Sequence, residues 1–208
     1  MNNTDEKKAG PFSAEPALSV EFFAEHQREL FPFTRKYIGP ANLDLGCGNG
    51  LTSYIHQREL GVAPTLGDVA DIRHKLARGF PFFVMKGGKL PFADNAFDSS
   101  YLQYVLHHLT TEQAVGELLA EAARVARRVV IVEEIAGART DVARAKKFDQ
   151  EVNDQIHPGT LMPVYKYYTK GEIERLFEKL SRKLVFHAVV SIGTPENGFL
   201  ETQVFVAE

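Results

Sequence analysis

The stretch from Leu43 to Gly50, LDLGCGNG, constrains the fold of this chain more than any other. It begins with the apolar residues of a buried strand and continues into three glycines at alternate positions. Leu51 and Ile55 then recur at helical spacing. A glycine-rich turn between a strand and a helix N-terminus lets a ligand lie against bare backbone. In an open α/β sheet, such a turn lies at the carboxyl end of a strand, where ligands bind.

Two common glycine patterns do not fit this turn. The dinucleotide fingerprint G-x-G-x-x-G needs its third glycine where Leu51 stands, and the phosphate loop needs a Gly-Lys-Ser/Thr that is absent. What remains is an acid, Asp44, followed by glycines at alternate positions. The turn is interpreted as a ligand-binding loop, and a glycine-rich turn with no ligand is the alternative interpretation.

Composition excludes several classes of protein. The net charge of −3 over 208 residues gives no overall electrostatic footprint for nucleic acid. The single cysteine, Cys47, cannot form an internal disulfide. No apolar run approaches the ~18–20 residues of a membrane span, and the polar N-terminus lacks the core of a signal peptide. We therefore expect a cytoplasmic protein with a disordered tail at 1–11 and a single domain at 12–208.

Hydrophobic periodicity and turn residues predict alternating strands and helices along the rest of the chain. Strands are expected at 42–45, 64–66, 82–85, 99–102, 129–132, 183–190 and 202–207. Helices are expected at 19–36 with an interruption near Pro32, at 50–59, 71–78 and 138–156, after Thr110 or Thr111, and from the capping box at Thr169 to about Leu180.

An acid stands where an adenosine ribose would need one. Asp68 follows the predicted strand 64–66 and lies about 20 residues beyond the glycines, where a carboxylate can accept both ribose hydroxyl protons. The alternative interpretation of Asp68 is a turn residue after Gly67.

Two further motifs follow in order. Residues 90–98 read LPFADNAFD, and residues 105–109 read VLHHL. With the glycine turn, they resemble the class I S-adenosylmethionine (SAM)-dependent methyltransferases from about residue 41 onward. The resemblance implies a Rossmann-like, doubly wound, seven-stranded and mostly parallel sheet with an antiparallel last strand and helices on both faces. It also implies SAM as cofactor and methyl transfer as the reaction.

The resemblance assigns cofactor-binding residues by position. The glycine loop supplies Asp44, Gly46, Cys47, Gly48 and Gly50; Asp68 is the ribose acid; and Gln103 lies near the methionine end of SAM. Where the family often has an acid for the adenine amino group, this chain has Lys86, whose ammonium has no lone pair. Backbone at Lys86 and Gly87 is then expected to contact adenine. The family's usual Pro-Gly-Gly turn before the fifth strand is also missing.

The catalytic candidates stand at predicted strand ends. Since SAM carries an activated methyl group, the protein must hold a nucleophile in line and exclude water, with a base only for a protonated nucleophile. His108 is the first candidate, followed by His107 and Glu134. The alternative is that the histidines only shape the pocket or cap a helix, and Cys47 is interpreted as packing. No metal is expected.

Residues 138–168 are predicted to be a lid on the substrate side. Substrate contacts are expected from Asn153, His157 and Tyr167. Asp149, Asn153 and His157 recur every four residues, next to an apolar stripe. This acid–amide–imidazole trio could hold a metal, but we do not expect one there, because methyl transfer needs none. The alternative is a helix that only covers the sheet.

The substrate is expected to be a small molecule, with protein or RNA as the second choice. Two other classes stay open. A SAM-binding but inactive partner subunit would share the glycine loop, and a nicotinamide-dependent oxidoreductase would share the sheet and Asp68, although the glycine spacing argues against it.

Overall fold

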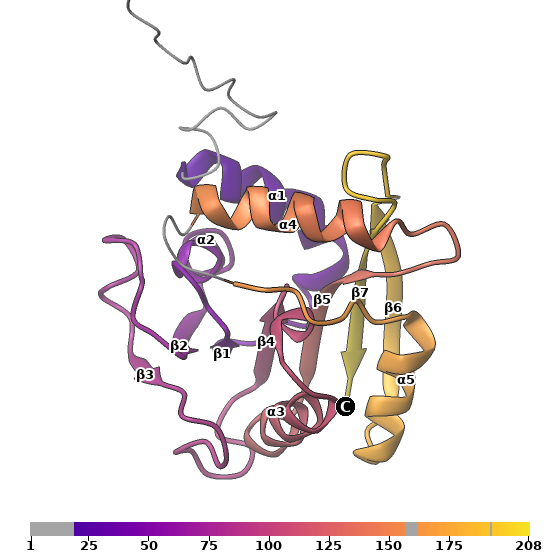
Figure 1. Cartoon of the computed structure of the whole chain (residues 1–208). Coiled ribbons are helices and arrows are strands. Elements are labelled where there is room, and N and C mark those ends of the chain that lie inside the picture. Colours follow the sequence, from indigo (N-terminus) through magenta and orange to yellow (C-terminus); the bar gives the residue numbers. More distant parts are fainter. Residues whose placement is uncertain (1–18, 157–161, 192) are drawn as a thin grey trace, which may run out of the picture.

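A computed structural model describes residues 19–156, 162–191 and 193–208. Its centre is a seven-stranded sheet with the order β3-β2-β1-β4-β5-β7-β6 (Figure 1). The strands are β1 (Ala41–Leu45), β2 (Ala63–Asp68), β3 (Phe82–Val84), β4 (Ser99–Gln103), β5 (Val129–Ile135), β6 (Leu184–Ser191) and β7 (Glu201–Ala207). The predicted tail at 1–11 and the predicted contact of His157 lie outside the described residues.

Strand directions confirm the predicted fold class. The pairs β1–β2, β1–β4, β2–β3 and β4–β5 are parallel. The last strand, β7, lies antiparallel between β5 and β6. Chain order reverses beside β1, where β2 pairs on one side and β4 on the other. This switch point puts the turn after β1 where an open α/β sheet binds its ligand.

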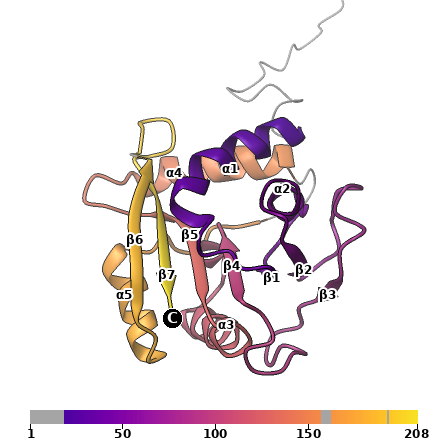
Figure 2. The same cartoon turned by 180° about the vertical axis from the view of Figure 1, so that it is seen from behind.

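Helices cover both faces of the sheet because β5 is apolar on both sides. Val129 and Ile131 pack against α3 (Glu112–Val125) and α5 (Lys170–Lys179). Val130 and Val132, one residue out of phase, share a cluster with Leu30 of α1 (Val20–Thr34). Helix α2 (Leu51–Leu60) packs against α1. Both helices lie on the far side of the sheet in Figure 1, and Figure 2 shows them from that side.

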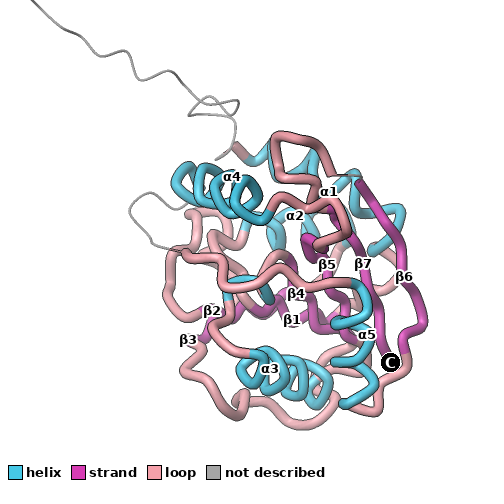
Figure 3. Tube along the Cα trace, turned by 45° about the vertical axis from the view of Figure 1, so that its right-hand side comes forward, coloured by secondary structure: helices cyan, strands magenta, loops and turns pink. Residues whose placement is uncertain are grey.

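Helix α4 (Val142–Ile156) lies beyond the ends of the central strands, beside α1, in Figures 1 and 2. After the gap in the description, the chain runs as a loop across the molecule to α5 (Figure 3). Tyr165 N donates to His107 O at 2.8 Å, and Ile135 forms a bridge with Tyr168. Segments 142–156 and 162–168 therefore stand over the carboxyl ends of β4 and β5.

Three sequence predictions about elements need correction. The first helix is not interrupted at Pro32 but continues to Thr34, because a proline in the last turn breaks few hydrogen bonds. Residues 71–74 are irregular and residues 75–79 form turns, so the helix expected at 71–78 is absent. Strand β5 extends three residues beyond Val132, to Ile135, because all of them pair with β7. Within the described ranges, no helix is both long and apolar enough to cross a membrane.

Candidate active site

A cavity of about 480 Å³ lies at the carboxyl ends of β1, β4 and β5. Its described walls come from the loop after β1, the end of β2, the segment after β4, and helices α1 and α4. Among the lining residues are Phe22, Phe23, His26, Asp44, Gly46, Cys47, Gly48, Asn49, Asp68, Met85, Gln103, Tyr104, Val105, His107, His108, Glu134, Phe148, Asp149, Val152, Asn153, Ile156 and Met162. Most of the residues predicted for cofactor and catalysis therefore share one space.

The glycine loop needs its glycines for conformation and for space. Gly46 has φ +76°, a left-handed conformation, and a Cβ there would lie 2.6 Å from Cγ2 of Val105. The Gly46 N–H donates to the carbonyl of Gly67 at 2.8 Å, which ties the loop to the end of β2. The bare backbone of this loop therefore faces the cavity with no side chain in the way.

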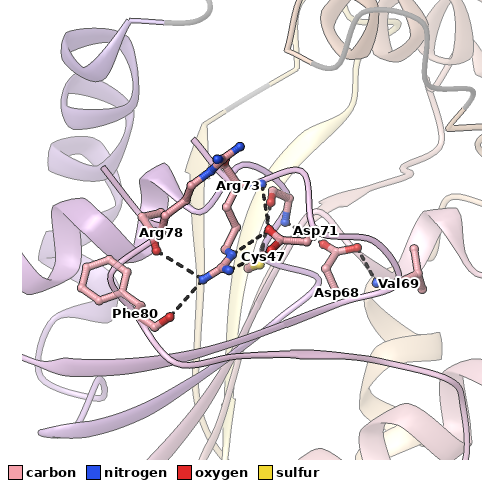
Figure 4. Close-up of polar contacts among 9 residues, drawn as sticks. Cys47, Asp68, Val69, Asp71, Arg73, Arg78 and Phe80 are labelled. Atoms are coloured by element: carbon pink, nitrogen blue, oxygen red, sulfur yellow. Dashed lines mark hydrogen bonds and ion pairs between the residues drawn. The ribbon is translucent and has the colours of Figure 1, made fainter. Parts of the chain in front are cut away.

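Asp68 joins the two loops of this edge. Its Oδ2 accepts from the Gly48 N–H at 2.7 Å, and its Oδ1 accepts from the Val69 N–H at 2.6 Å (Figure 4). A carboxylate has about four acceptor positions, so each oxygen keeps one for another donor. Asp68 also lines the cavity. The two acceptor oxygens therefore fit a ribose whose two adjacent hydroxyls donate to them.

An arginine holds the chain that follows Asp68. Arg73 binds both carboxylate oxygens of Asp71 at 2.8 Å and donates to the carbonyl of Phe80 at 2.9 Å (Figure 4). Its guanidinium also lies 4.2 Å from the centre of the Phe82 ring. Hydrogen bonding to Arg73 lowers the pKa of Asp71 to about 2. These contacts replace the helix expected at 71–78 and fix the loop beside the cavity.

The acid before the glycines is a buried structural group. Asp44 is 3% exposed and accepts a hydrogen bond from Ser53 Oγ at 2.6 Å, so it links β1 to α2. Burial raises its pKa to about 7. At the end of β4, Gln103 Oε1 accepts from Gln27 Nε2 and from the Tyr101 hydroxyl, both at 2.9 Å. Both side chains are held in place at the cavity wall.

The histidine pair lies in a 3₁₀ turn, Leu106–His108, beside buried Glu133. His107 Nδ1 lies 2.5 Å from Glu133 Oε1, and His107 Nε2 lies 3.0 Å from His108 Nε2. His108 Nδ1 lies 3.3 Å from the carbonyl oxygen of Pro163. Burial disfavours a charged His107, but the Glu133 carboxylate outweighs it and raises the His107 pKa to about 9.

Two more carboxyl groups complete the polar end of the cavity. Asp149 of α4 lies 3.7 Å from His107, measured from Oδ1 to Nε2, and Asn153 Nδ2 donates to both Asp149 oxygens at 3.1–3.2 Å. Burial raises the pKa of Glu134 to about 7 and that of Asp149 to about 6. This end therefore gathers carboxylates around two imidazoles.

Several predicted site residues lie elsewhere. Lys86 and Gly87 are exposed beyond β3 and are not among the described lining residues, and Gly50 is buried at the N-terminus of α2. Tyr167 is buried behind the lining, with its ring centroid 5.6 Å from that of His107 and its hydroxyl without a hydrogen-bond partner. The cofactor contacts of Lys86 and Gly87 and the substrate contact of Tyr167 stay predictions.

Sequence reasoning missed the role of Glu133. The sequence indicates only that Glu133 lies at a strand end, yet its side chain is fully buried against His107. An acid inside a run of β-branched residues was the available signal, since such an acid needs a buried partner. Phe22, Phe23 and His26 reach the cavity from α1, the N-terminal helix that the family resemblance places beside the cofactor mouth.

The strand order, the switch point and the glycine loop define a Rossmann-like fold of the methyltransferase type. A family model described as "Methyltransferase domain" matches residues 43–131, from the glycine loop into β5. Over residues 43–131 the chain is therefore similar to methyltransferase domains, in agreement with the resemblance to the class I SAM-dependent methyltransferases that its motifs indicate.

Solved structures share the fold at low sequence identity. A SAM-dependent methyltransferase from Methanosarcina mazei aligns with TM-score 0.67 and 19% identity, over 86% of this chain and 97% of that one. One from Archaeoglobus fulgidus gives 0.66 and 15%, over 91% and 94%. Geranyl diphosphate C-methyltransferase from Streptomyces coelicolor, in complex with Mg²⁺, geranyl diphosphate and S-adenosylhomocysteine, gives 0.62 and 16%, over 88% and 78%. No curated protein matches the sequence at a significant level.

Proposed function

We propose that this enzyme methylates a small molecule that binds in the same cavity as SAM. The observation that carries the proposal is the continuity of the cavity. Gly46, Gly48 and Asp68 line one part of it, and Asp149 and Asn153 of α4 line another. Its volume of about 480 Å³ falls within the ~300–1,000 Å³ of small-molecule sites.

The glycine-loop end is proposed to hold the cofactor. Asp68 accepts the ribose hydroxyls with its remaining acceptor positions, and the loop at Gly46 to Gly48 lets the nucleoside approach the backbone. Gln103 stands near the methionine part, and the backbone at Lys86 and Gly87 is proposed to contact adenine. When bound, SAM supplies a methyl group on a sulfonium, and transfer leaves the neutral thioether S-adenosylhomocysteine.

The α4 end is proposed to hold the acceptor. Phe148, Val152 and Ile156 give it an apolar wall, and Asp149 and Glu134 give it carboxyl groups. Among the described lining residues there is no lysine or arginine to pair with an anion. We therefore propose a neutral or cationic acceptor with an apolar body and a nucleophilic oxygen or nitrogen. The segment 138–168 then serves as the substrate-side lid.

The three catalytic candidates receive different roles. His107 is 1% exposed and held by Glu133, so it positions its neighbour. His108 and Glu134 stand at the cavity wall, where they orient the nucleophile. Because α1 and α4 both wall this space, their apolar side chains exclude water from the reacting atoms.

The test is transfer of a radiolabelled methyl group from SAM to a panel of acceptors. The panel contains phenols, alcohols and amines with apolar bodies, a prenyl diphosphate, total RNA and mixed protein. The proposal predicts label in at least one neutral or cationic small molecule and in neither macromolecule. Label in RNA or protein alone would contradict it. If the protein binds SAM but transfers the labelled methyl group to no member of the panel, the result would favour an inactive partner subunit.

A further inference from the structure

We infer that His107, His108 and Asp149 form a site for a divalent transition-metal ion at the acceptor end of the cavity. The two Nε2 atoms lie 3.0 Å apart, and a carboxylate oxygen of Asp149 lies 3.7 Å from His107 Nε2. One ligand atom from each of the three residues falls within 4.8 Å of the other two. This inference departs from the sequence analysis, which predicts no metal.

The hydrogen bonds on the far side of each imidazole determine which nitrogen is available. Glu133 already accepts from the backbone N–H groups of Leu106 and Glu134, at 2.8 and 2.9 Å, so it is an ionised acceptor. His107 Nδ1 must therefore donate to it. His108 Nδ1 must likewise donate to the carbonyl of Pro163. In the neutral form, each ring then carries its lone pair on Nε2, and the two Nε2 atoms lie 3.0 Å apart.

Two lone pairs at 3.0 Å repel, so a positive species belongs between the two nitrogens. It is either a proton shared by the rings or a metal ion bound by both. Metal-ligating histidines commonly donate their second ring N–H to a carboxylate or a backbone carbonyl, and these are the partners that His107 and His108 have. Two nitrogens ~2.0–2.1 Å from one ion lie about 3 Å apart when the angle at the ion is near 90°.

Charge favours the metal over the proton. Glu133 lies 2.5 Å and Asp149 3.7 Å from the nitrogens of His107, and Glu134 lines the same wall, so three carboxyl groups surround the imidazole pair. No lysine or arginine lies among the described residues of the cavity wall. A dication would compensate more of this charge. Asn153 holds both oxygens of Asp149 in place, as the outer partner of a ligating carboxylate would.

The ligand set selects the type of ion. Two imidazoles and one carboxylate suit zinc, iron or cobalt better than magnesium, which prefers oxygen ligands. Three protein ligands on one side leave coordination positions toward the cavity. On the proposed function, those positions would hold an oxygen or nitrogen of the acceptor, where a cation favours its deprotonated form.

The experiment titrates metal into the full chain after treatment with EDTA, without SAM or acceptor. Calorimetry with Zn²⁺ is expected to give one equivalent per chain, and Co²⁺ is expected to give visible absorption bands of a bound ion. Mg²⁺ is expected to bind at least 100-fold more weakly than Zn²⁺. Since neither cofactor nor acceptor is present, the result does not depend on the proposed function.

Variants locate the site. His108→Gln and Asp149→Asn are each expected to weaken Zn²⁺ binding at least tenfold. The control His187→Gln, on β6 and outside the cavity, should leave it within twofold. An unchanged far-UV circular dichroism spectrum and a cooperative urea transition in each variant show that it is folded.

Two results would overturn the metal site. One is undiminished Zn²⁺ binding in both cavity variants. The other is no Zn²⁺ binding by the parent protein, with nitrogen NMR showing both His107 nitrogens protonated, which would assign the position to a proton.

Discussion

Asp68, the last residue of β2, accepts a hydrogen bond from the backbone N–H of Gly48 in the loop after β1, with 2.7 Å between Oδ2 and N. One carboxylate thus shapes the glycine loop and faces the cavity that the loop borders. The contact joins residues 20 positions apart through two neighbouring parallel strands. The cofactor end of the site is therefore formed jointly by the end of β2 and the loop after β1, at one edge of the sheet.

Replacing Asp68 by alanine is expected to weaken SAM binding at least tenfold. The variant loses two charge-assisted hydrogen bonds to the ribose, each worth roughly 1.5–3 kcal/mol. Calorimetry measures the change, with Asp154→Asn on the exposed side of α4 as control. Binding within twofold of the parent would remove Asp68 from the cofactor site.

Gly46→Ala is expected to destabilise the protein more than Gly61→Ala does. Both glycines have φ near +70°, which costs another residue roughly 1–2 kcal/mol. Only Gly46 also has a neighbour in the way, Val105 Cγ2 at 2.6 Å, while nothing lies within 4 Å at Gly61. Overpacking should add about 1–3 kcal/mol. Urea unfolding of both variants measures the difference.

A mutant cycle isolates the contact with Val105. Gly46→Ala should lower the unfolding free energy less in a Val105→Ala background than in the parent protein. Equal losses of stability at Gly46 and Gly61 would mean that the loop has room for a Cβ.

Acidification is expected to destabilise the fold through His56. Burial lowers its pKa to about 3, and its Nδ1 has no hydrogen-bond partner. Because the folded pKa lies below the unfolded value of about 6.5, the unfolded state takes up the proton first as pH falls. The loss begins below pH ~6.5 and grows by up to ~1.4 kcal/mol per pH unit until pH ~3.

A variant without a titrating ring separates His56 from the other groups. Between pH 7.5 and 5, the unfolding free energy of the parent should fall about 2 kcal/mol more than that of His56→Phe. Urea unfolding at both pH values measures this. An equal fall in the unfolding free energy of the two proteins would show that the buried His56 ring does not contribute to the loss of stability in acid.

Asn153→Ala is expected to impair turnover without weakening SAM binding. Asn153 donates to both oxygens of the Asp149 carboxylate, at the end of the cavity that is proposed to hold the acceptor. The account of α4 as a lid predicts a raised KM or a reduced kcat, with SAM affinity within twofold. Lys146→Ala, exposed on the same helix, is the control. Normal kcat and KM in Asn153→Ala would make α4 a mere cover of the sheet.

Periodicity and glycines predicted most elements because those signals are local. Features made by distant partners were not predictable in this way. Arg73 bonds the carbonyl of Phe80 instead of continuing a helix, and only the folded loop shows this. Glu133 tolerates burial because His107, 26 residues away, pairs with it. The cofactor loop was readable from sequence, whereas the acceptor end depends on how α4 is placed across the strands.

A crystal structure with S-adenosylhomocysteine tests most directly whether one cavity holds both cofactor and acceptor. We predict that both ribose hydroxyls contact the Asp68 carboxylate and that the sulfur points toward the space between His108 and Asp149. A nucleoside bound away from Asp68, or a sulfur directed out of the cavity away from α4, would contradict this arrangement.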